Sequence, residues 1–381
     1  MNINSAGQTT GKQKIKEKEA AKIRYSLLGL KIDPDQKARG KLRMPANVAA
    51  FYGPPTAEDP LVVLDVRDSS DIPCVTLMRD CLHENVLHAR ILMERDPYLL
   101  VLVENYTGLL STYLRTIEAH IPDSQQMSDP HMMPSLTLQL IVTHMIDGLL
   151  ALFKHGKCHG NLKLENTCYI KTRNGDIITK LTGFKDRKVS ATKPVSHYQA
   201  EDIRSVGHGL TEITEIAEDF NKQGYSLDCF QIEHLAQRLK TVSPGDLYIT
   251  IEEIRTYPFF WTEVERSFFF VSEVPLALHH KLVRSSIEKE QDLCDLPWNC
   301  KHYNGFLQLM IDYRRNKKLP AYNFDSRVDY VQFISGLYTH QSQLTNPYGN
   351  VDTTVKSTNP RLYAILYSLL PRGPRRPIRQ D

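Results

Sequence analysis

The first half of the chain carries short apolar runs that predict β-strands. Aliphatic and aromatic residues dominate residues 48–52, the hexapeptide Leu61–Val66 and residues 98–106, which read YLLVLVENY. Runs of this length and composition are typical of strands. Residues 74–81, between the second and third runs, have the composition of a short helix. This part of the chain therefore predicts a mixed region of strands and helix, with mainly antiparallel strand pairing.

The most apolar stretch, residues 136–153, predicts a buried helix. It reads LTLQLIVTHMIDGLLALF, and His144 and Asp147 interrupt it. A membrane-spanning helix needs about 20 predominantly apolar residues, so this stretch falls short of a comfortable span. We therefore expect a core helix and a chain without a membrane segment.

Two short strands on either side of the tetrapeptide RNGD predict a β-hairpin. The strands are Thr167–Lys171 and Ile177–Leu181, and the Asn-Gly pair between them can take the positive φ values that a tight turn requires. A hairpin returns its two ends to one place. Residues near 161–166, before the hairpin, and residues near Gly183, after it, are therefore expected to share one surface.

Composition and charge narrow the class of protein. Of the 381 residues, 41% are hydrophobic and 24% are charged, which is typical of folded domains. The net charge of +3 is too small to make the whole surface attract nucleic acid or membrane, so we expect no DNA binding and only a local basic surface. The seven cysteines are scattered, odd in number and without a CxxC pair, which predicts thiols in the cytoplasm or nucleus and no zinc site.

The two ends of the chain differ from the rest. Residues 1–45 are rich in charge and poor in aromatics, which predicts a basic, disordered arm and no secretory signal. Residues 372–381 form a basic tail whose Pro and Arg content excludes a helix. We therefore expect a protein that is not secreted.

The loops that flank the hairpin resemble those of a known fold. HGNLKLEN (159–166) and LTGFKD (181–186) resemble the catalytic loop and the metal loop of the protein kinases, which begin with H-R-D and D-F-G. EDIRSVGHGL (201–210) resembles the buried kinase helix whose Asp, here Asp202, holds the catalytic loop. The resemblance covers roughly residues 48–261 and implies a bilobal kinase-like domain.

At the catalytic positions the chain departs from the kinase pattern. Asn161 stands where the proton-accepting Asp belongs, and an amide cannot act as a base at neutral pH. Gly183 replaces the metal-binding Asp, which leaves Asn166 as the one matching metal ligand. The resemblance therefore implies a pseudokinase that holds no metal, with ATP binding that is at best weak and independent of magnesium.

The anchor for the nucleotide phosphates is also missing. Asp65 or, in a shifted register, Arg67 stands where the phosphate-pairing Lys belongs, and its Glu partner falls near Pro73. A Gly-rich phosphate loop is absent from FYGPPTAEDP. Lys163 and Asn166 are then either nucleotide-binding remnants or, together with Asp202, residues that hold the loop in shape by hydrogen bonds.

After Trp261 the pattern changes to helices and polar loops, which predicts an all-α unit. An FF-V segment (268–274) and the later YRRNKK (313–318) make this region similar to the kinase-extension nuclease (KEN) domain. That domain occurs in the unfolded-protein-response sensor kinase/endoribonucleases and in ribonuclease L. The predicted fold is therefore α+β, with a bilobal kinase-like domain over residues 46–261 and an all-α KEN-like domain over residues 262–371.

The KEN resemblance also implies site residues. The Arg-Asn pair of the family matches Arg315 and Asn316, and its active-site Tyr matches Tyr303. Metal-free RNA cleavage needs a base, an acid and a cation at the phosphate, roles that Tyr, His and Arg can fill. Pro320 stands at the position of the catalytic His and is expected to end the helix early. His302 is the candidate substitute for that His.

Three functions remain open at this point. The first is a degenerate kinase/endoribonuclease-like protein that binds RNA or regulates a partner through dimerisation. Its partner would be a second copy or an active family member. The second is a residual metal-free endoribonuclease that acts in RNA processing or stress signalling. The third is a protein-interaction scaffold unrelated to RNA.

Overall fold

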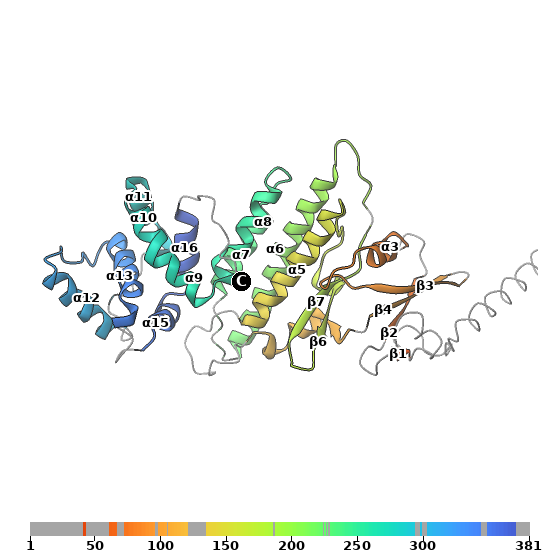
Figure 1. The fold of residues 1–381 in the computed structure, drawn as a ribbon, viewed down its shortest axis with the longest axis horizontal. Helices are drawn as coiled ribbons and strands as arrows, with labels where there is room; N and C mark the ends of the chain where they lie inside the picture. Colours follow the sequence, from red (N-terminus) through yellow and green to blue (C-terminus); the bar gives the residue numbers. More distant parts are fainter. Residues whose placement is uncertain are drawn as a thin grey trace, which may run out of the picture. The chain divides into compact units, whose positions relative to one another are not determined.

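The structure is a computed structural model of the chain (Figure 1). It describes residues 41–42, 61–66, 72–95, 98–104, 106–120, 135–185, 187–223, 225, 227, 229–293, 298, 303–343 and 349–370. The strand expected over residues 48–52, nearly all of the arm and the whole tail lie outside the described residues.

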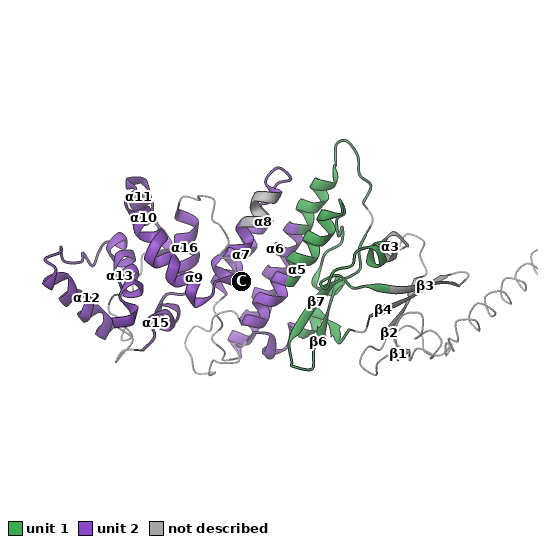
Figure 2. Cartoon of the chain, viewed as in Figure 1, with its two compact units in different colours: residues 1–113, 144–202 green, residues 114–143, 203–381 purple. Residues whose placement is uncertain are grey.

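The chain divides into two compact units (Figure 2). Unit 1 comprises Met1–Tyr113 and His144–Asp202, and unit 2 comprises Leu114–Thr143 and Ile203–Asp381. The boundary predicted between residues 261 and 262 lies inside unit 2.

Unit 1 contains two antiparallel sheets. The first has the order β1-β2-β4-β3, with β1 Lys41–Leu42, β2 Leu61–Val66, β3 Ala89–Arg95 and β4 Tyr98–Glu104. The strands predicted at residues 61–66 and within 98–106 are confirmed as β2 and β4, which pair with each other. The helix predicted at residues 74–81 is confirmed as α3, Ile72–Asp80. Strand β3 was not predicted from the sequence. Charged residues near both ends of its sequence, ARILMER, weaken the apolar pattern that is typical of a strand.

The second sheet contains the predicted hairpin. Its order is β5-β6-β7, with β5 Gly108–Leu109, and β6 Thr167–Lys171 and β7 Ile177–Leu181 have the predicted bounds. The turn differs from the prediction, because only Gly175 of the Asn-Gly pair has a positive φ, of 92°. Its amide donates to the Thr172 carbonyl, which makes a three-residue loop that ends in a left-handed glycine.

Helix α5, Leu136–Lys154, confirms the predicted core helix. It is long and apolar enough to cross a membrane by length and composition alone, and 56% of its most apolar window is buried in the protein. The buried side chains recur at helical spacing and include Leu138, Ile141, Val142, Met145, Leu149 and Leu152. One face of α5 is therefore buried against the rest of the protein, as in the core helix of a folded domain.

All elements described after Trp261 are helical, as expected. They are α9 Glu263–Phe268, a π-helical turn Phe269–Glu273, α10 Val274–Leu278, α11 Lys281–Lys289, α12 Asn304–Asn316, α13 Arg327–Thr339, α15 Val351–Thr358 and α16 Leu362–Leu369, with the 3-10 turn Gln291–Leu293 between α11 and α12. Before them in unit 2 come most of α6, Val195–Lys222, with α7, Phe230–Lys240, and α8, Leu247–Arg255. Helix α9 starts at a capping box, in which Thr262 and Glu265 each accept a hydrogen bond from the other's backbone amide.

A buried ion pair joins α9 to α15 in unit 2. The Arg266 guanidinium donates to both Asp352 carboxylate oxygens, at 2.8 and 2.9 Å, and also to the Trp261 carbonyl. The Tyr338 hydroxyl donates to Asp352 at 2.8 Å. Arg266 is 8% exposed and Asp352 2% exposed, so solvent screens the pair little. The pair therefore fixes how the helices after Trp261 pack on one another.

Breaking this pair should destabilise the protein strongly. Asp352→Asn leaves the Arg266 charge buried without a counter-charge, and we expect a loss of about 3–5 kcal/mol in the free energy of unfolding, measured with urea. The double variant Arg266→Met, Asp352→Leu should lose less than the two single changes added together. Arg315→Met removes the exposed ion pair with Asp312 and should change stability by less than about 1 kcal/mol. Equal losses for the buried and the exposed pair would contradict this assignment.

Candidate functional site

One buried carboxylate, that of Asp202, accepts hydrogen bonds from the start of the loop of residues 159–166. Asp202, on α6, accepts hydrogen bonds from the backbone amides of His159, at 2.6 Å, and Gly160, at 2.9 Å. Asp202 is 2% exposed, and burial raises the pKa of its carboxyl to about 7 although the two amide bonds act in the opposite direction. Two buried amides are thus satisfied by one side chain, which sets the start of the loop.

His159 is packed inside the protein and does not reach the surface. Its ring is fully buried and lies 4.5 Å from the Phe184 ring, centroid to centroid. The Asn161 amide donates to its Nδ1 at 3.3 Å. Burial lowers the pKa of His159 to about 3, so the ring stays neutral at physiological pH. It therefore cannot serve as an acid near neutrality.

The structure brings the predicted positions 161, 166 and 183 together. The side-chain amide of Asn161 donates to the Gly183 carbonyl at 3.1 Å, and that of Asn166 donates to the Asn161 carbonyl at 2.7 Å. The Thr182 amide donates to the Asn166 carbonyl at 3.1 Å. Each asparagine donates with its NH₂ group, which a carboxylate cannot do. We call these three residues the amide network.

Gly183 fits this network for two reasons. Its φ is 67°, in the left-handed region that favours glycine. A Cβ at residue 183 would also lie only 3.0–3.1 Å from the side chain of Asn166. Lys163 lies in the same loop with an exposed side chain, and its carbonyl accepts from Asn166 and from the Thr167 hydroxyl, both at 3.0 Å.

The segment after Gly183 lies against the loop, a contact that sequence reasoning missed. The Lys185 amide donates to the His159 carbonyl at 2.9 Å, and Arg187 Nε donates to the Gly160 carbonyl at 2.8 Å. Gly160 has a φ of 72°, and a Cβ there would lie 2.3 Å from the Lys185 carbonyl oxygen. The sequence held one signal of this contact: Gly160 stands where the H-R-D pattern has Arg, and a glycine permits close approach of another backbone segment.

The predicted nuclease residues on α12 lie at opposite ends of the helix. Tyr303 is the N-cap residue, is fully buried and packs edge-on against Phe333. Burial raises the pKa of Tyr303 well above its ordinary value. Arg315 and Asn316 are exposed in the last turn, roughly 18 Å away along the helix axis at about 1.5 Å per residue. The structure does not bring the three residues together.

Helix α12 ends before Pro320 and for a different reason from the predicted one. Lys318 has a φ of 53°, its amide donates to the Arg315 carbonyl, and the Leu319 amide donates to the Arg314 carbonyl. This is a Schellman motif, in which a left-handed residue stops the helix. Pro320 follows on the exposed turn, where its carbonyl accepts from Arg314 Nε at 2.6 Å.

The other predicted positions lie in regular elements of unit 1 or outside the described residues. Asp65 lies in β2 and Pro73 in α3. Arg67, His302 and the cations of the tail lie outside the described residues. Within the described part of the chain, no cluster of three or more His, Cys, Asp or Glu side chains could hold a metal ion.

Comparison with known proteins adds no assignment. No family model matches the chain, and no curated protein matches it in sequence.

The close approach of the Lys185 backbone to Gly160 predicts that an alanine substitution destabilises the protein more at Gly160 than at Gly156. Gly156→Ala and Gly160→Ala both place a side chain at positive φ, which costs about 1–2 kcal/mol. A Cβ at residue 156 meets nothing within 4 Å, whereas one at residue 160 meets a backbone oxygen. We therefore expect Gly160→Ala to lower the free energy of unfolding by at least about 1 kcal/mol more than Gly156→Ala.

Urea denaturation of the two variants measures this difference. Equal losses would show that residues 185–187 do not press on Gly160 in solution.

Proposed function

We propose that the chain is a degenerate kinase-like and KEN-like protein that acts by binding RNA and by self-association or pairing with an active relative. The amide network carries the first part of this proposal. Asn161, Asn166 and Gly183 bond to one another where the kinase resemblance needs a base and a metal ligand. A phosphoryl transfer enzyme needs anionic oxygen at those positions.

The environment of Tyr303 supports the loss of nuclease chemistry. A tyrosine at the RNA-cleaving centre must reach the 2′-hydroxyl or the phosphate, and this one is fully buried. Pro320, at the position that matches the catalytic His, has no group that titrates. The residual endoribonuclease remains the second candidate, because Arg315 and Asn316 are both exposed.

RNA binding is supported by the cations that end α12. Arg315, Lys317 and Lys318 are exposed within four consecutive residues, on both sides of Asn316. Arg314 is fixed beside them, with its guanidinium 4.2 Å from the Tyr322 ring centroid. Exposed cations of this kind bind phosphates without reading sequence. We call residues 314–318 the basic turn.

Self-association is supported by exposed apolar side chains on the helices that follow Trp261. Val264 is 70% exposed, Phe268 50% and Val271 40%, and they are spaced four and three residues apart. Leu276 and Leu282 are also exposed. Apolar residues that recur at this spacing on a solvent-facing helix are typical of a protein interface. This surface, the apolar stripe, also supports the scaffold as an alternative function.

Incubation with a stem-loop RNA in the absence of magnesium separates the three functions. We expect binding without cleavage, with an affinity that falls steeply as salt is raised. Arg315→Ala should weaken binding severalfold and reduce the salt dependence by about one ion. Lys222→Ala, which removes an exposed cation at the end of α6 that pairs with Asp219 much as Arg315 pairs with Asp312, is the control and should leave affinity unchanged. Cleavage would favour the residual endoribonuclease, and absence of both would favour the scaffold.

The apolar stripe predicts a concentration-dependent dimer. Phe268→Glu places a charge in the middle of the stripe and should shift the monomer–dimer equilibrium towards monomer at least tenfold, measured by sedimentation. Leu82→Glu makes the same kind of change at a 76% exposed residue of unit 1 and should have no effect. A wild-type protein that stays monomeric at high concentration, and does not bind an active relative, would argue against association through this stripe.

A further inference from the structure

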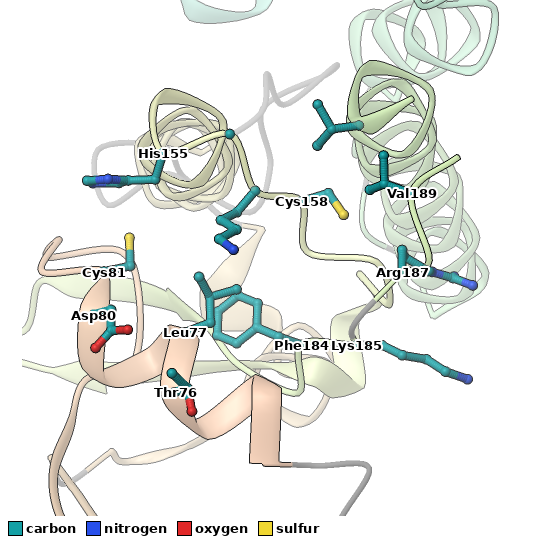
Figure 3. A pocket seen from close by; sticks show the side chains of 13 residues that line it. Thr76, Leu77, Asp80, Cys81, His155, Cys158, Phe184, Lys185, Arg187 and Val189 are labelled. Atoms are coloured by element: carbon teal, nitrogen blue, oxygen red, sulfur yellow. The ribbon is translucent and has the colours of Figure 1, made fainter. Parts of the chain in front are cut away.

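A cavity of about 600 Å³ opens in unit 1 beside the loop of residues 159–166 (Figure 3). Its walls come from three segments of the chain: the end of α3, the turn that follows α5, and residues 184–195. This volume lies in the range of sites that hold small organic ligands. None of the functions proposed above uses it.

One side of the cavity is apolar. Leu77 of α3, the Phe184 ring, Val189 and Val195 all line it, and Figure 3 shows the Leu77 and Phe184 side chains next to each other. Phe184 is itself packed on the buried His159 ring. An apolar body that enters the cavity can therefore rest on a surface that the core holds rigid.

The turn after α5 gives the cavity a positive charge. Gly156, with a φ of 64°, ends the helix in a Schellman motif, in which the Lys157 amide donates to the Leu152 carbonyl at 3.0 Å. The Lys157 carbonyl accepts from Gln199 Nε2 at 3.0 Å. The backbone of Lys157 is thus fixed on both sides, and this lysine lines the cavity.

Lys157 is the cation best placed for a ligand. Lys185 and Arg187 also line the cavity, but Figure 3 shows their charged ends directed away from it, and Arg187 Nε is held by the Gly160 carbonyl. Asp80 is the one carboxylate in the lining; Arg79 pairs with it at 2.7 Å, and Lys157 also interacts with it electrostatically. Because two cations, Arg79 and Lys157, share this one carboxylate, the net charge beside Lys157 is positive.

We propose that this cavity binds a small amphiphile with one anionic headgroup. Its apolar body would lie on Leu77, Phe184 and Val195, and its headgroup would pair with Lys157. A neutral ligand would leave the Lys157 charge without a partner, and a cationic ligand would be repelled by Lys157. The shared chemistry is one carboxylate or phosphate on an apolar chain or ring.

The test compares two probes of equal chain length, octanoate and octanol. Both would be titrated into the whole protein below their aggregation concentrations, with binding measured by calorimetry and by the shift of the melting temperature. Octanoate should bind saturably and at least about fivefold more tightly than octanol. Lys157→Met should remove this preference. Lys154→Met, one turn earlier at an exposed lysine outside the lining, should keep it.

Alkylation of Cys158 locates the bound probe. Cys158 lines the cavity and Cys229, in unit 2, does not, and both are half-buried thiols outside any disulfide. Octanoate should slow the reaction of N-ethylmaleimide with Cys158, with the same midpoint as the calorimetric titration, and leave the rate at Cys229 unchanged. Mass spectrometry of the two peptides measures both rates in one sample.

Each other outcome overturns a stated part of the proposal. Absence of saturable binding, or equal protection of both thiols, would show that the cavity takes no amphiphile. Equal affinities of octanoate and octanol, unaffected by Lys157→Met, would show that the headgroup assignment is wrong. Leu77→Trp, which fills the cavity without changing charge, should abolish binding of both probes, and binding that survives in a folded Leu77→Trp variant would place the ligand elsewhere.

Discussion

The backbone amides of His159 and Gly160 share the buried carboxylate of Asp202, and the geometry around the loop depends on this contact. Buried amides without acceptors cost free energy, so the loop keeps the path that lets both reach Asp202. That path puts the His159 ring on Phe184 and exposes the Gly160 carbonyl to Arg187. One carboxylate thus positions both the amide network and the wall of the cavity beside it.

The residues that the proposed kinase resemblance treats as departures from its pattern fit one another in the structure. In the observed geometry an Asp at residue 161 would set its carboxylate against the Gly183 carbonyl oxygen, where Asn161 donates a hydrogen bond. An Asp at residue 183 would need a left-handed φ and would crowd the Asn166 side chain. An Asp at either position alone would therefore remove a hydrogen bond or add strain. The residues present, Asn161 and Gly183, are the ones that stabilise the observed path of the loop.

Local patterns in the sequence predicted local structure well, and contacts between distant residues could not be predicted. Strands β6 and β7 have the expected bounds because an Asn-Gly pair and two apolar runs specify a hairpin within a few residues. The contact of Arg187 with Gly160 joins residues 27 apart, and the glycine at position 160 is the one local feature that hints at it without naming its partner. Tyr303 illustrates the same limit, because its place in a motif could not show that it faces the core.

Helices α5 and α12 end in the same backbone motif, which fixes the turn that follows each helix. Both helices end in a Schellman motif, with Gly156 in the left-handed position of the first and Lys318 in that of the second. Glycine takes this conformation without strain, whereas for lysine it costs about 1–2 kcal/mol. Part of that cost is offset because Lys317 and Lys318 lie at the negative end of the helix dipole. The bond from Arg314 to the Pro320 carbonyl and its stacking on Tyr322 further fix the turn. The backbone of the basic turn is therefore held in one conformation, so the phosphate binding that we propose would cost little backbone entropy.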